Sequence, residues 1–393
     1  MEYGFTPTQV ALAEQVREFA DTVVAPASYE YDTKQTLPYD IIRRMGEMGL
    51  FALPFPQVYG GSTTDGDYLS FCLAVEQIGR VDQSLGVTLE AGIGLGAVPI
   101  LRFGSQEQKD TWLPMLASGE ALGAFGLTEA GAGSDAGATQ TTAVLDGDEW
   151  VINGTKQFIT NSGPEITRLL TVTAVTGEVT RADGSTGPEL TAFLVPVPSE
   201  GLEVGPSYDK IGWHTSDTHP LTLTNVRVPK ENMLGEQGRG FAYAVACLDE
   251  GRIAFAALAT GAAQGCLEEA IRYSKERVVF GKAIESNQHI AFTIARMAAT
   301  VHTARLAWVE AARLMAAGEP FKKQASMAKL VASEAAVACS HDASHIFGGY
   351  GFLNSNVVAR HYRDSKVLEV GEGTTEVQLM VISRALGLSG GGL

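Results

Sequence analysis

Cysteine is scarce in this chain. The 393 residues include four cysteines, and none stands in a CxxC or Cys/His spacing that would hold a metal ion. Widely spaced cysteines without such a pattern are typical of buried free thiols in a reducing compartment. We therefore predict a cytoplasmic protein without a metal; the four residues are Cys72, Cys247, Cys266 and Cys339.

Basic residues and long apolar runs are also few. Lysine and arginine number 29 against 45 aspartates and glutamates, which gives a formal charge of −16. Phosphate backbones and anionic lipids attract basic surfaces, so this balance argues against a nucleic-acid partner and against polybasic membrane docking. No stretch approaches the roughly 18 consecutive apolar residues of a spanning helix, and the start, MEYGFTPTQV, lacks the pattern of a secretory signal. We expect no membrane insertion.

Apolar residues make up 45% of the chain, enough for large cores and more than one domain. Their spacing changes twice, from helical to β-branched runs separated by turn dipeptides, and back to helical. We predict a mostly α protein with a central antiparallel β domain, sheet or barrel, followed by what is most simply a four-helix bundle. The three domains are residues 1–122, 123–231 and 232–393.

Cap and turn residues set the expected elements. Thr6-Pro7-x-Gln9 predicts a helix start near Pro7, with an end around Pro26. Tight hairpin turns are expected at Asp146-Gly147 and Asn153-Gly154. An exposed loop is expected over 177–188. Four bundle helices are expected, over 241–277, over 286–318, from after Pro320 to about 347, and over 375–386.

Two segments of the predicted β domain have residues suited to a flat ligand. The glycine-rich run from Gly126 to Asp135 lets backbone approach such a ligand closely, although a plain connecting turn is an equally good interpretation. It matches neither the Rossmann fingerprint nor a Walker motif. In the strand that follows, Phe158 and Thr160 are two residues apart and should share a face, as they would also in an ordinary half-buried strand.

Two charged residues stand out in the predicted helical domain. Arg252 falls on an otherwise apolar helical stripe, and a buried guanidinium is costly unless paired, so an ion pair for function or for packing is expected. Glu372 lies in a glycine-flanked bend before the last helix, which a capping box at Thr375 and Gln378 would start. Alone, Glu372 is better explained as complementing the helix dipole than as a functional group.

Two further segments suit phosphates or a nucleotide, and both also suit plain helix ends. The run from Arg277 to Lys282 precedes Gln288, and the run from His345 to Gly351 ends a predicted helix.

Taken together and in order, these segments resemble the acyl-CoA dehydrogenase family of flavoproteins. The resemblance begins at Pro56-Gln57-Val58-Tyr59-Gly60-Gly61 and reaches the Glu-Gly-Thr run at Glu372, nearly the whole chain. It implies an α-helical domain, a central β-barrel and a carboxy-terminal four-helix bundle, assembled as a homotetramer made of two dimers. It also implies FAD as the cofactor, an acyl-CoA substrate, electron-transferring flavoprotein as the acceptor, and a role in fatty acid β-oxidation.

The resemblance assigns roles to individual residues. Glu372 matches the catalytic base, and the substrate contacts are Ser134, Asp249, Arg252 and Gly373. The implied FAD contacts are Phe125, Leu127, Thr128, Gly133, Ser134, Phe158, Thr160, Thr374 and Glu376 near the flavin, and Arg277, Phe280, Gln288, His345, Ile346, Gly348 and Gly349 at the adenine and pyrophosphate, across a dimer interface.

Some positions depart from the family pattern. Gly371 stands where several members have Tyr, His345 where Gln is usual, and Phe158 where Trp is common. Some relatives carry the base at the position of Gly251, but the glutamate present here at 372 favours the carboxy-terminal base. Glu90 lies in a small-residue segment near the expected end of the acyl pocket, although burial statistics favour a surface position for it.

The implied reaction removes the α-proton of an acyl thioester and passes the β-hydride to FAD, giving a trans-2-enoyl thioester. Glu372 should sit in an apolar slot that raises its pKa, and its backbone N–H with a flavin hydroxyl would meet the enolate oxygen. The alternatives are an acyl-CoA oxidase, a flavin monooxygenase of the same fold, a dehydrogenase of carrier-protein thioesters, and a non-enzymatic helical scaffold. The retained Glu372 argues against the monooxygenase.

Overall fold

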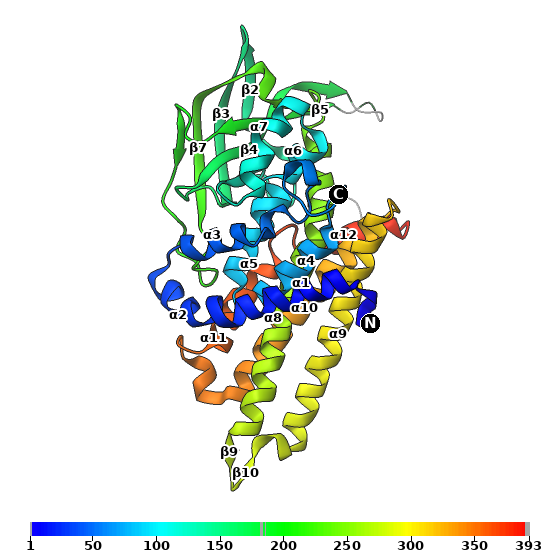
Figure 1. Cartoon of the computed structure of the whole chain (residues 1–393). Coiled ribbons are helices and arrows are strands. Elements are labelled where there is room, and N and C mark those ends of the chain that lie inside the picture. The colour runs from blue at the N-terminus through cyan, green and yellow to red at the C-terminus, as the bar shows by residue number, and fades with distance from the viewer. Residues whose placement is uncertain (1, 181–183, 185, 390–393) are drawn as a thin grey trace.

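The computed structural model describes residues 2–180, 184 and 186–389. A sheet lies at one end of the molecule, shorter helices lie across the middle, and long helices reach the opposite end (Figure 1). The predicted order of helical, sheet and helical regions is confirmed.

The amino-terminal region is helical, and its first helix begins as predicted. Thr6 Oγ1 accepts a hydrogen bond from the Gln9 N–H at 3.2 Å, while Gln9 Oε1 accepts from the Thr6 N–H at 3.0 Å. The predicted end near Pro26 is wrong, because a π-helical turn over Ala20–Val24 leads directly into the next helix, where Pro26 occupies the first turn and needs no N–H partner. The helices are α1 (Pro7–Phe19), α2 (Ala25–Lys34), α3 (Tyr39–Glu47), α4 (Tyr68–Gly79), α5 (Gln83–Glu90), α6 (Val98–Phe103) and α7 (Gln106–Ala117).

The middle region is an open mixed sheet, so the expected barrel is wrong. Strand order is β6-β7-β3-β2-β4-β5-β8, with β1 pairing parallel to β4. The end strands β6 and β8 have three and two residues, too few to form the long ladders that close a barrel. The strands are β1 (Leu122–Gly126), β2 (Thr142–Asp146), β3 (Glu149–Thr160), β4 (Thr167–Thr180), β5 (Thr186–Pro196), β6 (Leu202–Val204), β7 (Thr218–Pro229) and β8 (Met233–Leu234).

The structure differs from the predicted turn at Asn153-Gly154 and from the predicted loop over 177–188. Asp146-Gly147 does join β2 to β3, but Asn153-Gly154 lies inside β3. A Cβ on Gly154 would be 2.4 Å from Thr141 Oγ1, so glycine allows a close approach of chains at a bulge there. The loop predicted over 177–188 is mostly strand, since β4 and β5 pair as far as Thr180 and Thr186; 181–183 and 185 lie outside the described residues.

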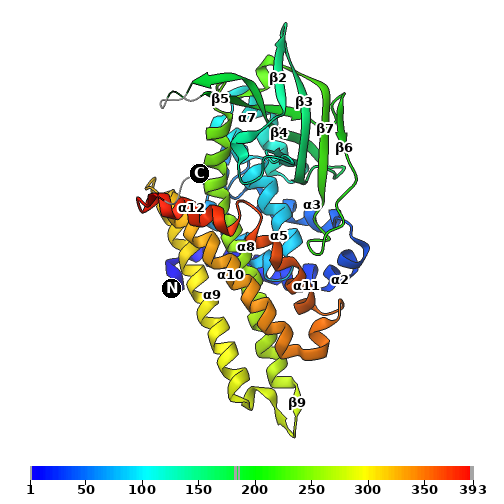
Figure 2. The same ribbon diagram turned by 180° about the vertical axis from the view of Figure 1, so that it is seen from behind.

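The carboxy-terminal region contains all four predicted helices within a few residues of their expected limits, with one further short helix. α8 (Gly240–Glu276) has 37 residues, about 55 Å at 1.5 Å per residue, and runs from the sheet to the far tip (Figure 2). A hairpin of β9 (Val278–Val279) and β10 (Lys282–Ala283) forms that tip. The other helices are α9 (Gln288–Ala316), α10 (Lys322–Phe347), α11 (Val357–Ser365) and α12 (Thr375–Ala385).

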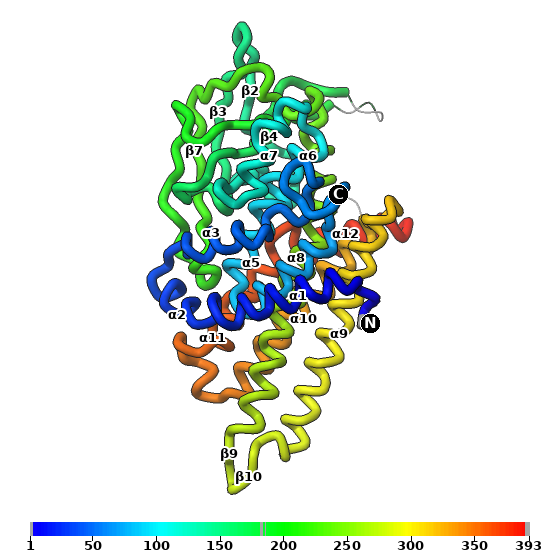
Figure 3. The backbone as a smooth tube through the Cα atoms, viewed as in Figure 1, coloured from blue at the N-terminus to red at the C-terminus, as the bar shows by residue number. Residues whose placement is uncertain are grey.

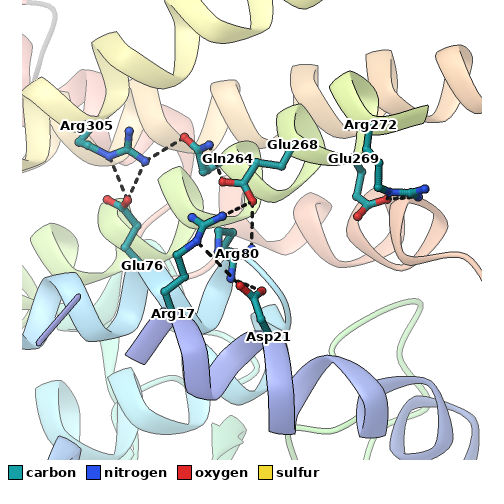
Figure 4. A network of polar contacts seen from close by, with 9 residues as sticks. All are labelled: Arg17, Asp21, Glu76, Arg80, Gln264, Glu268, Glu269, Arg272 and Arg305. Carbon is teal, nitrogen blue, oxygen red and sulfur yellow. Dashed lines mark hydrogen bonds and ion pairs between the residues drawn. The ribbon is translucent and has the colours of Figure 1, made fainter. Parts of the chain in front are cut away.

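Buried ion pairs join the two helical regions (Figure 4). Glu76 in α4 is 2% exposed, pairs with Arg305 of α9 at 2.7 Å and accepts a hydrogen bond from Trp308 Nε1 at 3.0 Å. Arg80, which follows α4, reaches Glu268 of α8 at 3.0 Å. These contacts fix α4 against the long helices, and α4 forms part of the wall around the candidate site.

The amino terminus also lies against the long helices. The backbone tube shows α1 crossing them near the middle of the molecule (Figure 3), where Arg17 Nη2 donates to Glu268 at 2.8 Å. One helical run among the described residues, Gln83–Phe103, is long and apolar enough to span a membrane by composition, but 89% of it is buried inside the protein. That burial is typical of the core helix of a globular fold.

Candidate active site

Glu372 lies in the turn before α12 and has a strained backbone. Its φ of 53° is in the left-handed region, which non-glycine residues rarely adopt, and Gly373 follows at φ 93°. Strained backbone of this kind persists only where the surroundings hold it, and it clusters at functional sites.

Two fully buried side chains hold this turn. Lys329 of α10 donates from Nζ to the Gly373 carbonyl at 2.9 Å, and Gln378 Nε2 donates to the same oxygen at 2.8 Å. The predicted capping box of Thr375 and Gln378 is wrong, because Thr374 caps α12 by accepting from the Val377 N–H at 3.3 Å and Val377 has no side-chain group to return a hydrogen bond. Gln378 instead holds the Glu372 turn.

Both oxygens of the Glu372 carboxyl group are buried. Neither of its oxygens has a hydrogen-bond partner among the described residues. Burial raises its pKa to about 7, while Glu90 and the positive charges of Arg252 and Lys329 oppose that rise. Such a carboxyl group is suited to act as a base near neutral pH.

Gly251 of α8 provides space for this carboxyl group. A Cβ at position 251 would be 2.8 Å from Glu372 Oε2, closer than real contacts allow. The neighbouring Arg252 is 5% exposed and pairs with Asp249 at 2.5 Å, which confirms the expected burial and ion pair. Asp249 also pairs with Lys322 at 3.2 Å. Glu372, Gly373 and Arg252 therefore lie together at one site.

The glycine-rich run is fixed to β3 by a buried ion pair. Lys156 is 0% exposed, and its Nζ lies 2.8 Å from Glu129 Oε1 and donates to the Leu127 carbonyl at 3.2 Å. The Gln157 N–H donates to the Thr128 carbonyl at 2.9 Å. Around Gly131 and Gly133 an added Cβ would meet nothing within 4 Å, and Ser134 is exposed, so this run faces open space.

The end of β3 does not have the regular alternation expected there. Phe158 has φ 61°, and the pairing of β3 with β7 shifts between Lys156 and Ile159. The spacing of two residues between Phe158 and the half-buried Thr160 therefore does not show that both side chains lie on the same face of β3. Phe158 is 63% exposed and packs on Tyr208, with ring centroids 5.1 Å apart.

A second group of the expected FAD residues lines a cleft of about 790 Å³ at the far tip. Phe280 is fully exposed beside the β9–β10 hairpin, and Gly348 has a left-handed φ of 58°. Gln288 and His345 are exposed residues near this cleft in sequence, but neither lines it. Of the expected residues, the lining holds Arg277, Phe280, Ile346, Gly348 and Gly349.

The structure thus separates the predicted residues into two groups. From Arg252 to Arg277 the chain follows α8 for 25 residues, about 38 Å at the helical rise. Figures 1 and 2 both show the β9–β10 tip at the opposite end from the sheet. Phe125, at the end of β1, and Thr374 and Glu376, at the start of α12, are on the elements of the first group.

Sequence reasoning misplaced one residue at the site and missed two. Glu90 was considered for the acyl pocket, but the favoured surface position is wrong, because Glu90 is 0% exposed on α5, which packs against α4 and α8. Lys329 interrupts the alanine run Ala325, Ala328, Ala332 on a buried helix face, a signal that could have been used. Lys156 occupies an inward position of β3, but only the structure shows Glu129 as its partner.

Comparison with protein-family models matches three consecutive regions of the chain. The acyl-CoA dehydrogenase amino-terminal domain matches residues 6–120, the middle domain 124–226 and the carboxy-terminal domain 238–387. The probable acyl-CoA dehydrogenase YngJ of Bacillus subtilis is 45% identical over 98% of this chain and 100% of its own.

Solved structures of acyl-CoA dehydrogenases are also similar to this chain. Butyryl-CoA dehydrogenase from Megasphaera elsdenii has 41% identity and a TM-score of 0.93, covering 98% of this chain and 100% of its own. A chain in a structure of the electron transferring flavoprotein of Acidaminococcus fermentans has 42% identity and a TM-score of 0.93, covering 98% and 99%. The chain therefore belongs to the acyl-CoA dehydrogenase family and is an FAD-dependent oxidoreductase of acyl-CoA thioesters.

Proposed function

We propose that this enzyme oxidises a short-chain acyl-CoA to the trans-2-enoyl-CoA with Glu372 as the base. The observation that carries the proposal is the buried carboxyl group of Glu372, which has no hydrogen-bond partner in the described part of the chain. Its pKa of about 7 lets it ionise near neutral pH and then hold a proton. The similarity to butyryl-CoA dehydrogenase supports a short acyl chain.

In this proposal Glu372 accepts the α-proton of the thioester. Its backbone N–H donates to the enolate oxygen that forms, and the positive charges of Arg252 and Lys329 favour negative charge in the site. Gly371 lies against Phe255, because a Cβ there would be 3.1 Å from Phe255 Cζ. The Phe255 ring therefore occupies space beside the base.

The first group of residues fits a bound flavin. The glycine-rich run faces open space, and the ion pair of Lys156 with Glu129 fixes this run to β3. Phe158 of β3 adds an exposed aromatic ring. Leu127, Thr128 and Thr160 would contact the flavin ring there. FAD supplies the acceptor for the hydride that leaves the β-carbon.

The second group of residues would hold the adenine and pyrophosphate of FAD bound to a partner subunit. Arg252 and Arg277 are about 38 Å apart along α8. This separation supports a dimer with shared FAD sites, and we propose the homotetramer of two such dimers.

We also propose electron-transferring flavoprotein as the electron acceptor and the cytoplasm as the location. The similarity to a chain in the Acidaminococcus flavoprotein structure supports the first. All four cysteines are free and buried, which fits a reducing compartment.

Anaerobic titration with acyl-CoAs of increasing chain length tests the substrate. Bleaching of the flavin absorbance by butyryl-CoA, with little bleaching by long chains and slow recovery in air, supports a short-chain dehydrogenase. Rapid recovery in air would instead establish an oxidase, and bleaching by long chains alone would contradict the proposed substrate.

A further inference from the structure

The aromatic ring of Phe255 lies beside the turn that carries Glu372. Phe255 follows Gly251 by four residues in α8, so the two positions share one face of the helix. Gly251 is the position whose added Cβ would be 2.8 Å from Glu372 Oε2. A Cβ on Gly371 would be 3.1 Å from Phe255 Cζ and 3.6 Å from Phe255 Cε2. The ring is therefore within one helical turn of the Glu372 carboxyl group and touches the residue before it.

Two neighbours fix the position of this ring. Phe255 is 2% exposed, and Lys329 Nζ lies over the ring, 5.5 Å from its centroid. The Trp213 ring lies at 65° to it, with centroids 6.2 Å apart. Trp213 is itself held, because its backbone N–H donates to Asp364 Oδ1 at 2.7 Å. The Phe255 ring is thus a fixed part of the wall beside Glu372.

Burial along α8 indicates which way an acyl chain extends from the thioester. Asp249 marks the solvent side, since the side chain of its partner Lys322 is 53% exposed. From Gly251 to Ala263, every residue of α8 is buried. Burying a charged group is costly, so the large, charged CoA group stays on the solvent side. With the thioester beside Glu372, the acyl chain then points into the buried side, toward Phe255.

We propose that Phe255 is a specificity-determining residue that closes the acyl site and restricts the substrate to short chains. This inference rests on the proposed function, because it assigns the acyl side of the site that Glu372 serves. Gly371 does not adopt a positive φ, so its backbone would accept a side chain, and the Phe255 ring is what leaves no room for one. The large residue on α8 and the small residue in the turn form a matched pair.

The test exchanges the sizes of the two residues in the FAD-loaded enzyme. Phe255→Ala removes the ring, Gly371→Phe adds one from the turn, and the double variant moves the ring from α8 to the turn. The readout is the second-order rate constant of anaerobic flavin reduction by butyryl-CoA and by octanoyl-CoA. One methylene in an apolar pocket changes such a constant by about 10-fold or more, so Phe255→Ala should raise the octanoyl to butyryl ratio at least about 10-fold.

The two rings should compete for the same space. Gly371→Phe alone should slow flavin reduction by both acyl-CoAs, because the added side chain meets Phe255. The double variant should be faster than Gly371→Phe and should again favour butyryl-CoA. A double variant no faster than Gly371→Phe would overturn the proposal. So would a wild type that octanoyl-CoA reduces as fast as butyryl-CoA does.

Phe255→Leu keeps the test decisive if Phe255→Ala does not fold, because leucine removes less volume and keeps the site apolar. It should raise the ratio in the same direction by a smaller factor, and an unchanged ratio in the folded variants would overturn the proposal. Phe193→Ala, which removes a fully buried ring from the sheet core, is the matched control and should leave the ratio unchanged. An equal rise in Phe193→Ala would also overturn the proposal, since general loosening would then set the ratio.

Failure of the proposed function is seen separately. It would appear as undiminished flavin reduction in Glu372→Gln, whereas the role of Phe255 is read from the ratio between two chain lengths within one variant.

Discussion

At the scale of single residues, the site depends on what is missing beside Glu372. Gly251 has no side chain, so α8 leaves space for the carboxyl group, and Gly373, with a φ of 93°, allows the turn that presents it. The result is a carboxyl group surrounded by protein whose oxygens have no hydrogen-bond partner among the described residues. Function here follows from packing that leaves a particular group unsatisfied.

Gly251→Ala should displace the Glu372 carboxyl group, because the new Cβ would lie 2.8 Å from Oε2. A misplacement of about 1 Å can cost on the order of 10²-fold in rate, so we expect a loss of that size in kcat/KM. FAD content and binding of the enoyl-CoA product serve as controls and should remain. Undiminished kcat/KM would show that the carboxyl group does not need this space.

The pH dependence of kcat/KM should report the same group. A base works only when ionised, so activity should rise with pH and reach half its plateau near the Glu372 pKa of about 7. The measurement is kcat/KM for butyryl-CoA between pH 5 and 9. A rate already at its plateau at pH 5 would mean that the base is not a buried carboxyl group with a raised pKa.

At the scale of elements, spacing predicted the regular parts and missed those set by distant partners. The Thr6 cap and the long helices follow from local pattern, and they are present. Asn153-Gly154 has the composition of a hairpin turn, but close contact with Thr141 makes it a bulge inside β3. The burial of Glu90 likewise depends on packing among α4, α5 and α8, which no local pattern contains.

Glu76→Ala should destabilise the junction of α4 with α9. It removes the partner of Arg305, whose side chain is 15% exposed, and leaves Trp308 Nε1 without an acceptor. Breaking a buried pair typically costs about 3–5 kcal/mol, measurable as a lower urea midpoint. Arg227→Ala, which breaks an exposed pair with Asp146, is the control and should cost about 1 kcal/mol or less. Equal effects of the two changes would show that burial does not strengthen the Glu76 pair.

At the scale of the whole molecule, α8 separates Glu372 from the distal cleft, and the proposed site shared between subunits would account for both groups of residues. The resemblance in the sequence implied this division, yet only the structure shows how far Arg277 lies from Arg252 along one rigid helix. The residue pattern left sheet and barrel open and the resemblance implied a barrel, because closure depends on the lengths of β6 and β8, which composition does not determine.

Coexpression of Arg277→Ala with Glu372→Gln tests the shared site. Each variant alone should be nearly inactive, the first through loss of FAD and the second through loss of the base. A mixed dimer has one site with an intact base and an intact partner cleft, so random pairing should restore roughly a quarter of wild-type activity. No recovery in isolated mixed dimers would mean that each chain completes its own site.

The measurement that tests the central claim most directly is single-turnover anaerobic reduction of the flavin by butyryl-CoA, in the wild type and in Glu372→Gln. We predict that the variant binds FAD and product as before but is bleached at least about 10³-fold more slowly, since the amide cannot accept the α-proton. Bleaching of the variant at the wild-type rate would contradict Glu372 as the base.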